Sequence, residues 1–470
     1  MPDLRLRRAA VALLAAVALL VVSGCSVVVV GRPRAAQPPP DDAAPGRVTV
    51  VGAVEGPIDL LARNALADLE DYWAEQFPDV YGDRFTPLAG GYFSVDPASV
   101  DPAVYPQGVG CGADPSEVEG NAFYCQAPQA PNSDSITYDR SFLEDLAGQY
   151  GRFIPALVMA HEFGHAVQAR VGAPASSIAT ETQADCFAGA WTAWVADGEA
   201  AHSTIRAPEL DELLRGYLLL RDPVGTSRAE QQAHGSYFDR VSAFQEGFDD
   251  GPTACRDRFG PDRVFTQGQF TSDDDLRSGG NSPYGVVEQL VQESLPEFWT
   301  RAFSDVLEGE FTPPQLTAFA GDAPGCAAAG DADLVYCPPG DGDGGDDGLV
   351  AYDERDLTGP VVEQLGDFAF PTAVSIPYAL AARDQLGLST DDEAAARSAV
   401  CLTGWYGAQV YNGSLSTVRV SPGDIDESVQ FLLEYGNDPQ VLGDVQLSGF
   451  QLVDLFRSGF LEGSAACDVG

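Results

Sequence analysis

The chain has 470 residues, an apolar fraction of 45% and a formal net charge of −44 at pH 7. All 26 basic residues are arginines, and the acidic excess excludes a nucleic-acid-binding role, because the phosphate backbone would repel this protein. The same charge argues against electrostatic adhesion to an anionic membrane and weakly favours basic substrates. The apolar fraction is typical of a globular protein, and the length exceeds that of one ordinary domain.

The N-terminus has the pattern of an export signal. Three arginines precede an apolar run over residues 9–22, and two small residues then lead to Cys25. This pattern predicts a secretory signal peptide over residues 1–24 rather than a membrane span. Cys25 resembles the cysteine of a bacterial lipobox, so we expect a lipid there that holds the protein on the outer face of the cell membrane; a signal peptide cleaved elsewhere is the alternative. Residues 25–46 are rich in Pro and Ala and are interpreted as a tether.

The elements that follow predict a mainly helical α+β fold. Apolar residues at helical spacing predict a helix over 57–78 that ends near a proline. Two short strands, 123–125 and 135–138, are expected around a polar turn. Four further helices are expected: one that carries the motif H-E-x-x-H, one from Glu181 to about Val195, one around 208–220 and one over 234–248. A polar, Gly-rich and acidic segment over 256–282 is predicted to be a linker.

The most specific motif in the chain is H-E-x-x-H, formed by His161, Glu162 and His165. Positions four apart share one face of a helix, so both imidazoles can bind one metal ion. Glu181, sixteen positions after the second histidine, would complete the His₂Glu ligand set that is known for catalytic zinc. We expect Glu162 to take a proton from the activated water and Asp185, one turn after Glu181, to accept the outer N–H of a ligand histidine.

The polar residues also allow other interpretations. A solvated helix with two incidental histidines is the alternative for the motif, but the apolar stretch over 153–160 favours a buried helix. His202 has no partner motif, and we expect a surface histidine there. The aspartates of residues 339–348 could bind calcium, but their spacing is not that of an EF-hand, and a flexible insertion is favoured.

Three sequence blocks carry a family resemblance. A-H-E-F-G-H-A-V-Q, E-T-Q-A-D-C-F-A-G-A-W and H-G-S-Y-F-D-R-V-S-A-F-Q-E-G-F resemble the bacterial "putative neutral zinc metallopeptidase" family across roughly residues 60–255. The chain is more distantly similar to the membrane-bound CAAX prenyl proteases. The resemblance implies a gluzincin-like fold and a substrate border formed by His234 and Arg240. In zincins generally, a strand near the metal helix receives an extended substrate, and residues 135–138 are the candidate strand.

The second half of the chain repeats features of the first. Pairs of identical residues recur 215 positions apart: Cys111/Cys326, Gly172/Gly387, Cys186/Cys401 and Gly189/Gly404. The offset is 226 near the start of each half and 212 near its end, and loop insertions between fixed elements would produce such changes. At the 215 offset the three ligands become Ile376, Leu380 and Ala396. We therefore expect a peptidase domain over 47–255 and a degenerate, metal-free copy over 283–470, with one zinc ion per chain; compositional coincidence is the alternative.

Eight cysteines remain besides Cys25, an even number that predicts disulfides in an exported protein. Two copies that share one internal pattern leave few possible pairings. The pairings that we expect are Cys111–Cys125 with Cys186–Cys255 in the first half, and Cys326–Cys337 with Cys401–Cys467 in the second.

Together these patterns predict a lipid-anchored zinc endopeptidase that hydrolyses a peptide or protein substrate through zinc-activated water, with Glu162 as the base. By the same family resemblance, His234 is expected to stabilise the oxyanion, and Arg240, six residues on, to orient the site or meet a substrate carboxylate. The alternatives for these two residues are a helix-cap histidine and a surface cation. Alternative functions are a lipoprotein scaffold or binding protein with structural zinc, and a zinc hydrolase of cell-wall peptide amides. A retained glutamate base favours an enzyme.

Overall fold

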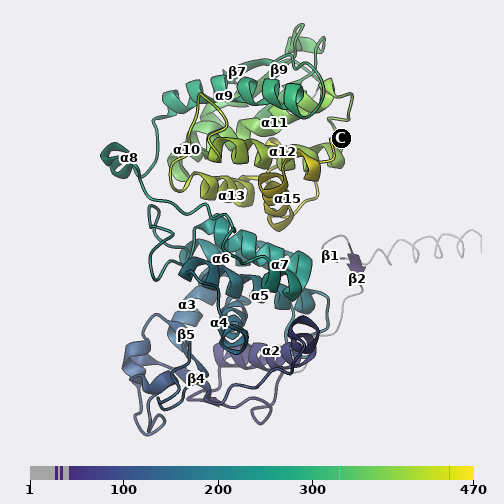
Figure 1. Ribbon diagram of the computed structural model, residues 1–470. Helices are drawn as coiled ribbons and strands as arrows, with labels where there is room; N and C mark the ends of the chain where they lie inside the picture. Colours follow the sequence, from purple (N-terminus) through teal and green to yellow (C-terminus); the bar gives the residue numbers. More distant parts are fainter. Residues whose placement is uncertain (1–26, 30–31, 35–41, 328, 444, 470) are drawn as a thin grey trace, which may run out of the picture.

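The computed structural model describes residues 27–29, 32–34, 42–327, 329–443 and 445–469. The predicted signal peptide, the lipidation site Cys25 and much of the tether lie outside these residues. No helix within the described ranges has both the length and the apolar character that crossing a membrane requires. The chain forms two mainly helical halves, with the N-terminal half below and the C-terminal half above in Figure 1.

The N-terminal half packs a small sheet against a group of helices. Its elements are β1 (Val27–Val29), β2 (Arg32–Arg34), β3 (Val50–Val51), α2 (Pro57–Tyr81), β4 (Gly91–Val95), β5 (Ala122–Cys125), β6 (Ser135–Asp139), α3 (Arg140–Tyr150), α4 (Ile154–Val171), α5 (Ser177–Ala196), α6 (Ala207–Leu220) and α7 (Tyr237–Asp257). The strand order is β3-β4-β6-β5, in which β4 runs parallel and β5 antiparallel to β6. Helix α5 packs between α4 and α7. The mainly helical α+β prediction is confirmed.

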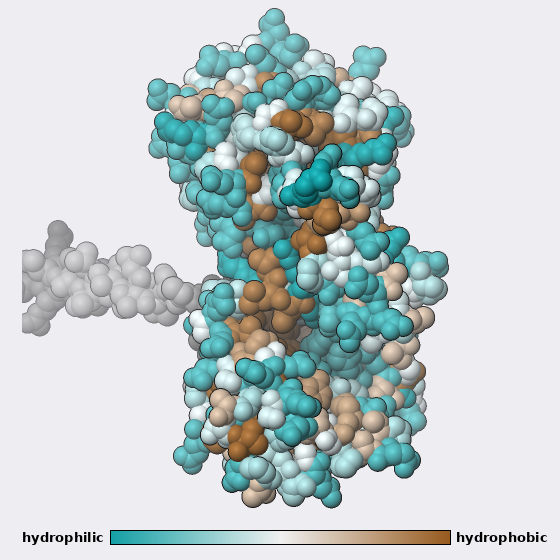
Figure 2. All heavy atoms as spheres, turned by 90° about the vertical axis from the view of Figure 1, so that its left-hand side faces the viewer, coloured by the Kyte–Doolittle hydropathy of each residue, from teal (hydrophilic) through white to brown (hydrophobic). Residues whose placement is uncertain are grey.

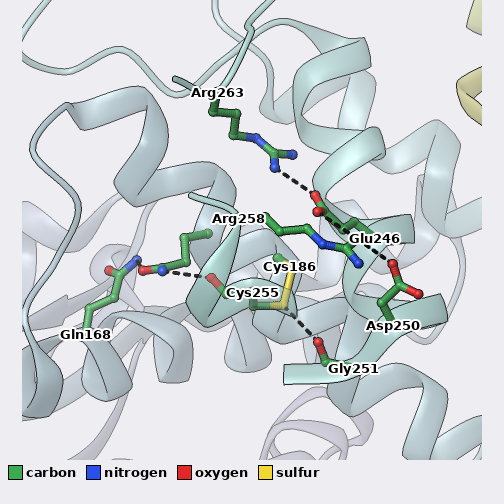
Figure 3. Close-up of a disulfide and its surroundings, with 9 residues drawn as sticks. Gln168, Cys186, Glu246, Asp250, Gly251, Cys255, Arg258 and Arg263 are labelled. Carbon is green, nitrogen blue, oxygen red and sulfur yellow. Dashed lines mark hydrogen bonds and ion pairs between the residues drawn. A yellow bond between two sulfur atoms is a disulfide. The ribbon is translucent and has the colours of Figure 1, made fainter. Parts of the chain in front are cut away.

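Two glycines bring α5 and α7 into close contact. A Cβ atom on Gly189 of α5 would collide with the carbonyl oxygen of Phe244, and one on Gly247 of α7 would collide with that of Cys186. Larger residues at either position would therefore force the two helices apart. The disulfide between Cys186 and Cys255 joins the same pair of helices (Figure 3). Side chains on α5 and α7 are consequently held in a fixed relation.

Several predicted boundaries are wrong. Helix α2 continues through Pro78 to Tyr81, because the proline stands in the last turn and its carbonyl still accepts the N–H of Gly82. Helix α7 begins at Tyr237 rather than at residue 234, because the side chain of Ser236 accepts the N–H of Asp239 and caps the helix there. Strand β4 and helix α3 were not predicted, and the predicted linker contains the end of α7.

The C-terminal half presents a similar succession of elements. They are α8 (Asp273–Ser278), α9 (Tyr284–Asp305), β7 (Gln315–Phe319), β8 (Leu334–Cys337), β9 (Leu349–Asp353), α10 (Gly359–Gln364), α11 (Ala369–Gln385), α12 (Glu393–Tyr411), α13 (Asp424–Tyr435), α14 (Pro439–Leu442) and α15 (Gly449–Glu462). Strand β7 is parallel and β8 antiparallel to β9, as β4 and β5 are to β6. Gly404 and Gly459 bring α12 and α15 as close together as α5 and α7. The duplication stays a proposal, which these correspondences support.

All four predicted cysteine pairings are present. The bonds are Cys111–Cys125, Cys186–Cys255, Cys326–Cys337 and Cys401–Cys467. The first and third each close a short loop beside a small sheet, whereas the second and fourth tie a central helix to the end of its half.

The two halves meet through aromatic side chains of α7 and α15. Phe238, near the start of α7, packs against two phenylalanines of α15, with ring centroids 6.2 and 4.8 Å away. Phe450, near the start of α15, packs against two phenylalanines of α7, with ring centroids 6.4 and 4.9 Å away. Each half therefore inserts one aromatic ring into the other. On the face shown in Figure 2, the surface at the junction is hollowed and apolar.

Candidate metal centre

The structure brings the three predicted metal ligands together. His161 and His165 lie on one face of α4, with their Nε2 atoms 3.2 Å apart. Oε2 of Glu181, on α5, lies 3.3 Å from Nε2 of His161 and 3.5 Å from Nε2 of His165. Ligand atoms at about 2.1 Å from a tetrahedral zinc ion are about 3.4 Å apart, so the three distances fit zinc. Such a set leaves a fourth position for water or substrate.

The ring of His161 is oriented by a buried ion pair. Its Nδ1 lies 2.8 Å from Oδ1 of Asp185, which is fully buried. Asp185 also accepts two N–H bonds from the guanidinium of Arg240, each at 2.8 Å. Burial alone would raise the pKa of Asp185, but Arg240 and His161 together hold it below its ordinary value. A carboxylate on Nδ1 fixes the tautomer that presents Nε2 to the metal.

The ring of His165 is oriented by a chain of amides that the sequence analysis missed. Its Nδ1 lies 2.9 Å from Oε1 of Gln168, whose Nε2 donates to Oε1 of Gln183 at 3.0 Å. Gln183 in turn donates to the carbonyl of Cys255 at 2.9 Å. In Figure 3 the dashed line to the Cys255 carbonyl leads toward Gln168, on one side of the disulfide that joins α5 and α7. Gln168 stands three positions after His165 on the same helix face, a spacing that could have revealed it.

Glu162 is poised next to the ligands without being one of them. Its side chain is 7% exposed, and its Oε2 accepts the backbone N–H of Tyr124 at 2.7 Å. Burial raises the pKa of Glu162, and the neighbouring histidines oppose this shift. The carboxylate is therefore held against strand β5, beside the predicted metal position.

The predicted substrate-binding strand, residues 135–138, is wrong. This segment is β6, which pairs with β4 on one side and β5 on the other, so its backbone groups are already used. Strand β5 is an edge strand of the sheet, and Ala122, Phe123 and Tyr124 line the cavity in front of the metal ligands. The two strands are indistinguishable by local sequence, because the order of strands in a sheet is set by long-range packing.

The metal ligands open onto a cavity of about 610 Å³ that also reaches His234 and Arg240. The side chain of His234 is 47% exposed, and its Nδ1 lies 3.1 Å from Oδ1 of Asp222. Its backbone N–H donates to the same carboxylate at 2.7 Å, so Asp222 fixes both its loop and its ring. Arg240 is 4% exposed. The alternative of a surface cation is therefore wrong for Arg240.

Other polar sites are separate from this cavity. His202, expected at the surface, is half-buried and lines a different cavity, where its backbone N–H donates to Asp68. Within the described residues only one further group has metal-ligand spacing: the buried carboxylates Asp367, Asp424 and Glu427. Burial and the nearby Asp367 raise the pKa of Glu427 to about 8. A protonated carboxyl in this group can therefore donate a hydrogen bond to a neighbouring carboxylate. The aspartates of residues 339–348 belong to neither group.

Comparison with known proteins agrees with this centre. The profile of the family described as "Putative neutral zinc metallopeptidase" matches residues 9–259, more than half of the chain. The chain belongs to this family. The matched segment of the chain contains all three predicted ligand positions and ends before α8.

The chain is similar to several uncharacterized proteins. Proteins of Mycobacterium tuberculosis and Mycobacterium bovis are 33% identical over 177 residues, which cover 32% of this chain and 58% of each relative. The Escherichia coli protein YpfJ is 28% identical over 221 residues, which cover 42% of this chain and 69% of the relative. The chain thus spans less than two thirds of the length of the mycobacterial relatives. No solved structure matches it.

Proposed function

We propose that the chain is a zinc endopeptidase whose metal is held by His161, His165 and Glu181. The observation that carries this proposal is the convergence of three ligand atoms, 3.2 to 3.5 Å apart, beside a buried glutamate that is not a ligand. A structural zinc site has no use for such a glutamate, and it normally takes four protein ligands. Membership of the family described as "Putative neutral zinc metallopeptidase" supports both the identity of the metal and the class of reaction.

In the proposed reaction Glu162 is the general base and acid. Zinc, when bound, would supply Lewis acidity that acidifies a water molecule and polarises the substrate carbonyl. Glu162 takes the proton of the attacking water and then delivers it to the leaving amine nitrogen. Its hydrogen bond from Tyr124 holds one carboxylate oxygen in place and leaves the other available for the proton.

Strand β5 is the proposed docking edge for an extended peptide. Alternate residues of a strand direct their backbone groups to the same side, so Ala122 shares the outward orientation of Tyr124. The N–H of Tyr124 is used by Glu162, which leaves its carbonyl and the backbone of Ala122 for substrate pairing. Apolar side chains from three helices also line the cavity: Phe142, Leu157, Val158, Tyr217 and Leu220. This lining favours an apolar substrate side chain next to the scissile bond.

We assign different roles to the two further residues of the cavity. His234 faces the cavity from a loop held by Asp222 and is the proposed donor to the oxyanion. The guanidinium of Arg240 donates hydrogen bonds to Asp185 and to the carbonyl of Leu220. Arg240 therefore helps to orient His161, through Asp185, rather than binding a substrate carboxylate. Cys25 remains the proposed lipid anchor, which would place the enzyme on the outer face of the cell membrane.

Removal of the metal tests the proposed function. Purified protein should contain about one zinc ion per chain, and stripping it with a chelator should abolish cleavage of a mixed peptide library. Addition of zinc should restore cleavage at the same bonds, which mass spectrometry of the products would identify. If protein with a full complement of zinc cleaves nothing in the library, the function of a binding protein replaces the proposed one.

Replacement of His234 tests the oxyanion donor. His234→Ala should lower kcat by about 10²–10³-fold, the size expected for one oxyanion donor, while metal analysis shows unchanged zinc. His202→Ala is the control, because His202 lines a different cavity. An unchanged kcat in His234→Ala would assign this histidine a structural role.

A further inference from the structure

The two halves cap each other's helices with buried carboxylates. Asp426 of α13 accepts N–H bonds from the first two residues of α7, at 3.1 and 2.9 Å. Asp211 of α6 accepts N–H bonds from the first two residues of α15, at 3.0 and 2.7 Å. Each carboxylate satisfies donors that a helix start leaves unpaired. The start of α7, in the half that holds the metal ligands, therefore depends on a side chain from the other half.

Asp426 has an additional contact that Asp211 lacks among the described residues. It accepts a charge-assisted bond from Nη1 of Arg221 at 2.8 Å, and its side chain is only 3% exposed. Arg221 directly follows α6, and the next residue is the Asp222 that holds His234. One carboxylate thus fixes both ends of the segment that runs from Arg221 to the start of α7 and carries His234.

Helix α7 in turn supports both ligand histidines. Near its start, Arg240 binds Asp185, which orients His161. Near its end, the carbonyl of Cys255 accepts the amide chain that orients His165. The helix is broken at Gly251, whose φ of 75° is not helical, and the disulfide ties Cys255 to α5. A shift of the start of α7 would therefore move mainly the partner of the His161 ring. Loss of such an outer partner commonly lowers metal affinity and activity.

We propose that Asp426 is a positioning residue of the metal centre, through which the second half holds α7 and the His234 segment in place. The proposal rests on the proposed function for its catalytic consequence, but its effect on zinc binding does not. The C-terminal half would then have a role: it holds in place elements that support the metal centre of the N-terminal half.

The experiment compares two matched variants of the full, zinc-loaded chain. Asp426→Ala and Asp211→Ala each remove a buried carboxylate that caps a helix across the same interface. Thermal unfolding should show a loss of stability in both, and the larger loss in Asp426→Ala, which also breaks the ion pair with Arg221. Only Asp426→Ala should lower kcat, by about tenfold or more, and weaken zinc binding in competition with a chelator by a similar factor. Asp426→Asn keeps an oxygen that can accept an N–H bond from the start of α7, so it should recover part of the kcat and part of the zinc affinity.

Two further readouts keep the test decisive. If Asp426→Ala does not fold, Arg221→Ala breaks the ion pair with α7 still capped and should weaken zinc binding; zinc affinity is the readout for this variant, because Arg221 also lines the cavity. If the wild type binds zinc but hydrolyses no peptide, the proposed function fails, while the zinc affinities of the two variants still test the positioning role. Equal effects of Asp426→Ala and Asp211→Ala on zinc affinity and kcat would overturn the proposal, because Asp426 would then be an ordinary interface residue.

Discussion

The Glu162→Gln variant should lose peptide hydrolysis by about 10²–10⁴-fold and keep its full complement of zinc. An amide cannot take the proton of the attacking water, whereas its oxygen can still accept the N–H of Tyr124 that Glu162 now accepts. The shape of the site should therefore persist while its chemistry is lost. Rates would be measured by mass spectrometry of peptide products, and zinc by elemental analysis of the same samples.

A suitable control for this variant is Glu144→Gln. Glu144 is an exposed glutamate on α3, so the substitution makes the same chemical change away from the metal ligands. Its activity should equal that of the wild type. Retained hydrolysis in Glu162→Gln would show that another group acts as the base, and loss of zinc would show that Glu162 is itself a ligand.

The His165→Ala variant should release the metal and, with it, all activity. Two remaining ligands hold zinc far more weakly than three, so the fall in affinity should exceed the 10- to 100-fold that loss of an outer partner produces. Equilibrium competition with a chelator measures this affinity directly. Because disulfides and helix packing remain, the variant should stay folded.

A graded series sharpens this second prediction. Gln168→Ala removes only the partner of the His165 ring and should weaken zinc binding by about 10- to 100-fold. His202→Ala should change nothing. Stoichiometric zinc in His165→Ala under chelator competition would mean that the metal is bound elsewhere, and the acidic group around Glu427 would then be the next candidate.

Features that depend on spacing within one helix were predictable from the sequence. His161 and His165 are one helical turn apart, and Glu181 and Asp185 share a face of the next helix, so their roles could be proposed without a fold. The cysteine pairings followed from comparison of the two halves. In each case the partner residues either lie within one or two helical turns or recur at the corresponding positions of the second half.

Features that depend on contacts between distant segments were not predictable. Nothing local distinguishes β5 from β6, although only β5 has a free edge. Asp222 and Asp426 are two acidic residues among 70, and their partners lie on other elements. The end of α2 differs from prediction for a local reason, because a proline in the last turn is tolerated where its carbonyl can still accept a hydrogen bond.

The reciprocal contacts between α7 and α15 have the pattern of a two-fold symmetric dimer, in which the same patch on each subunit meets its counterpart. On the proposed duplication, the two subunits of such a dimer are fused into one chain. Fusion holds the partners together at a high effective concentration, so dilution cannot separate them. It also removes the constraint that every substitution must appear in both subunits. Ile376 and Leu380 could thus replace metal ligands in one copy while the other copy kept its own.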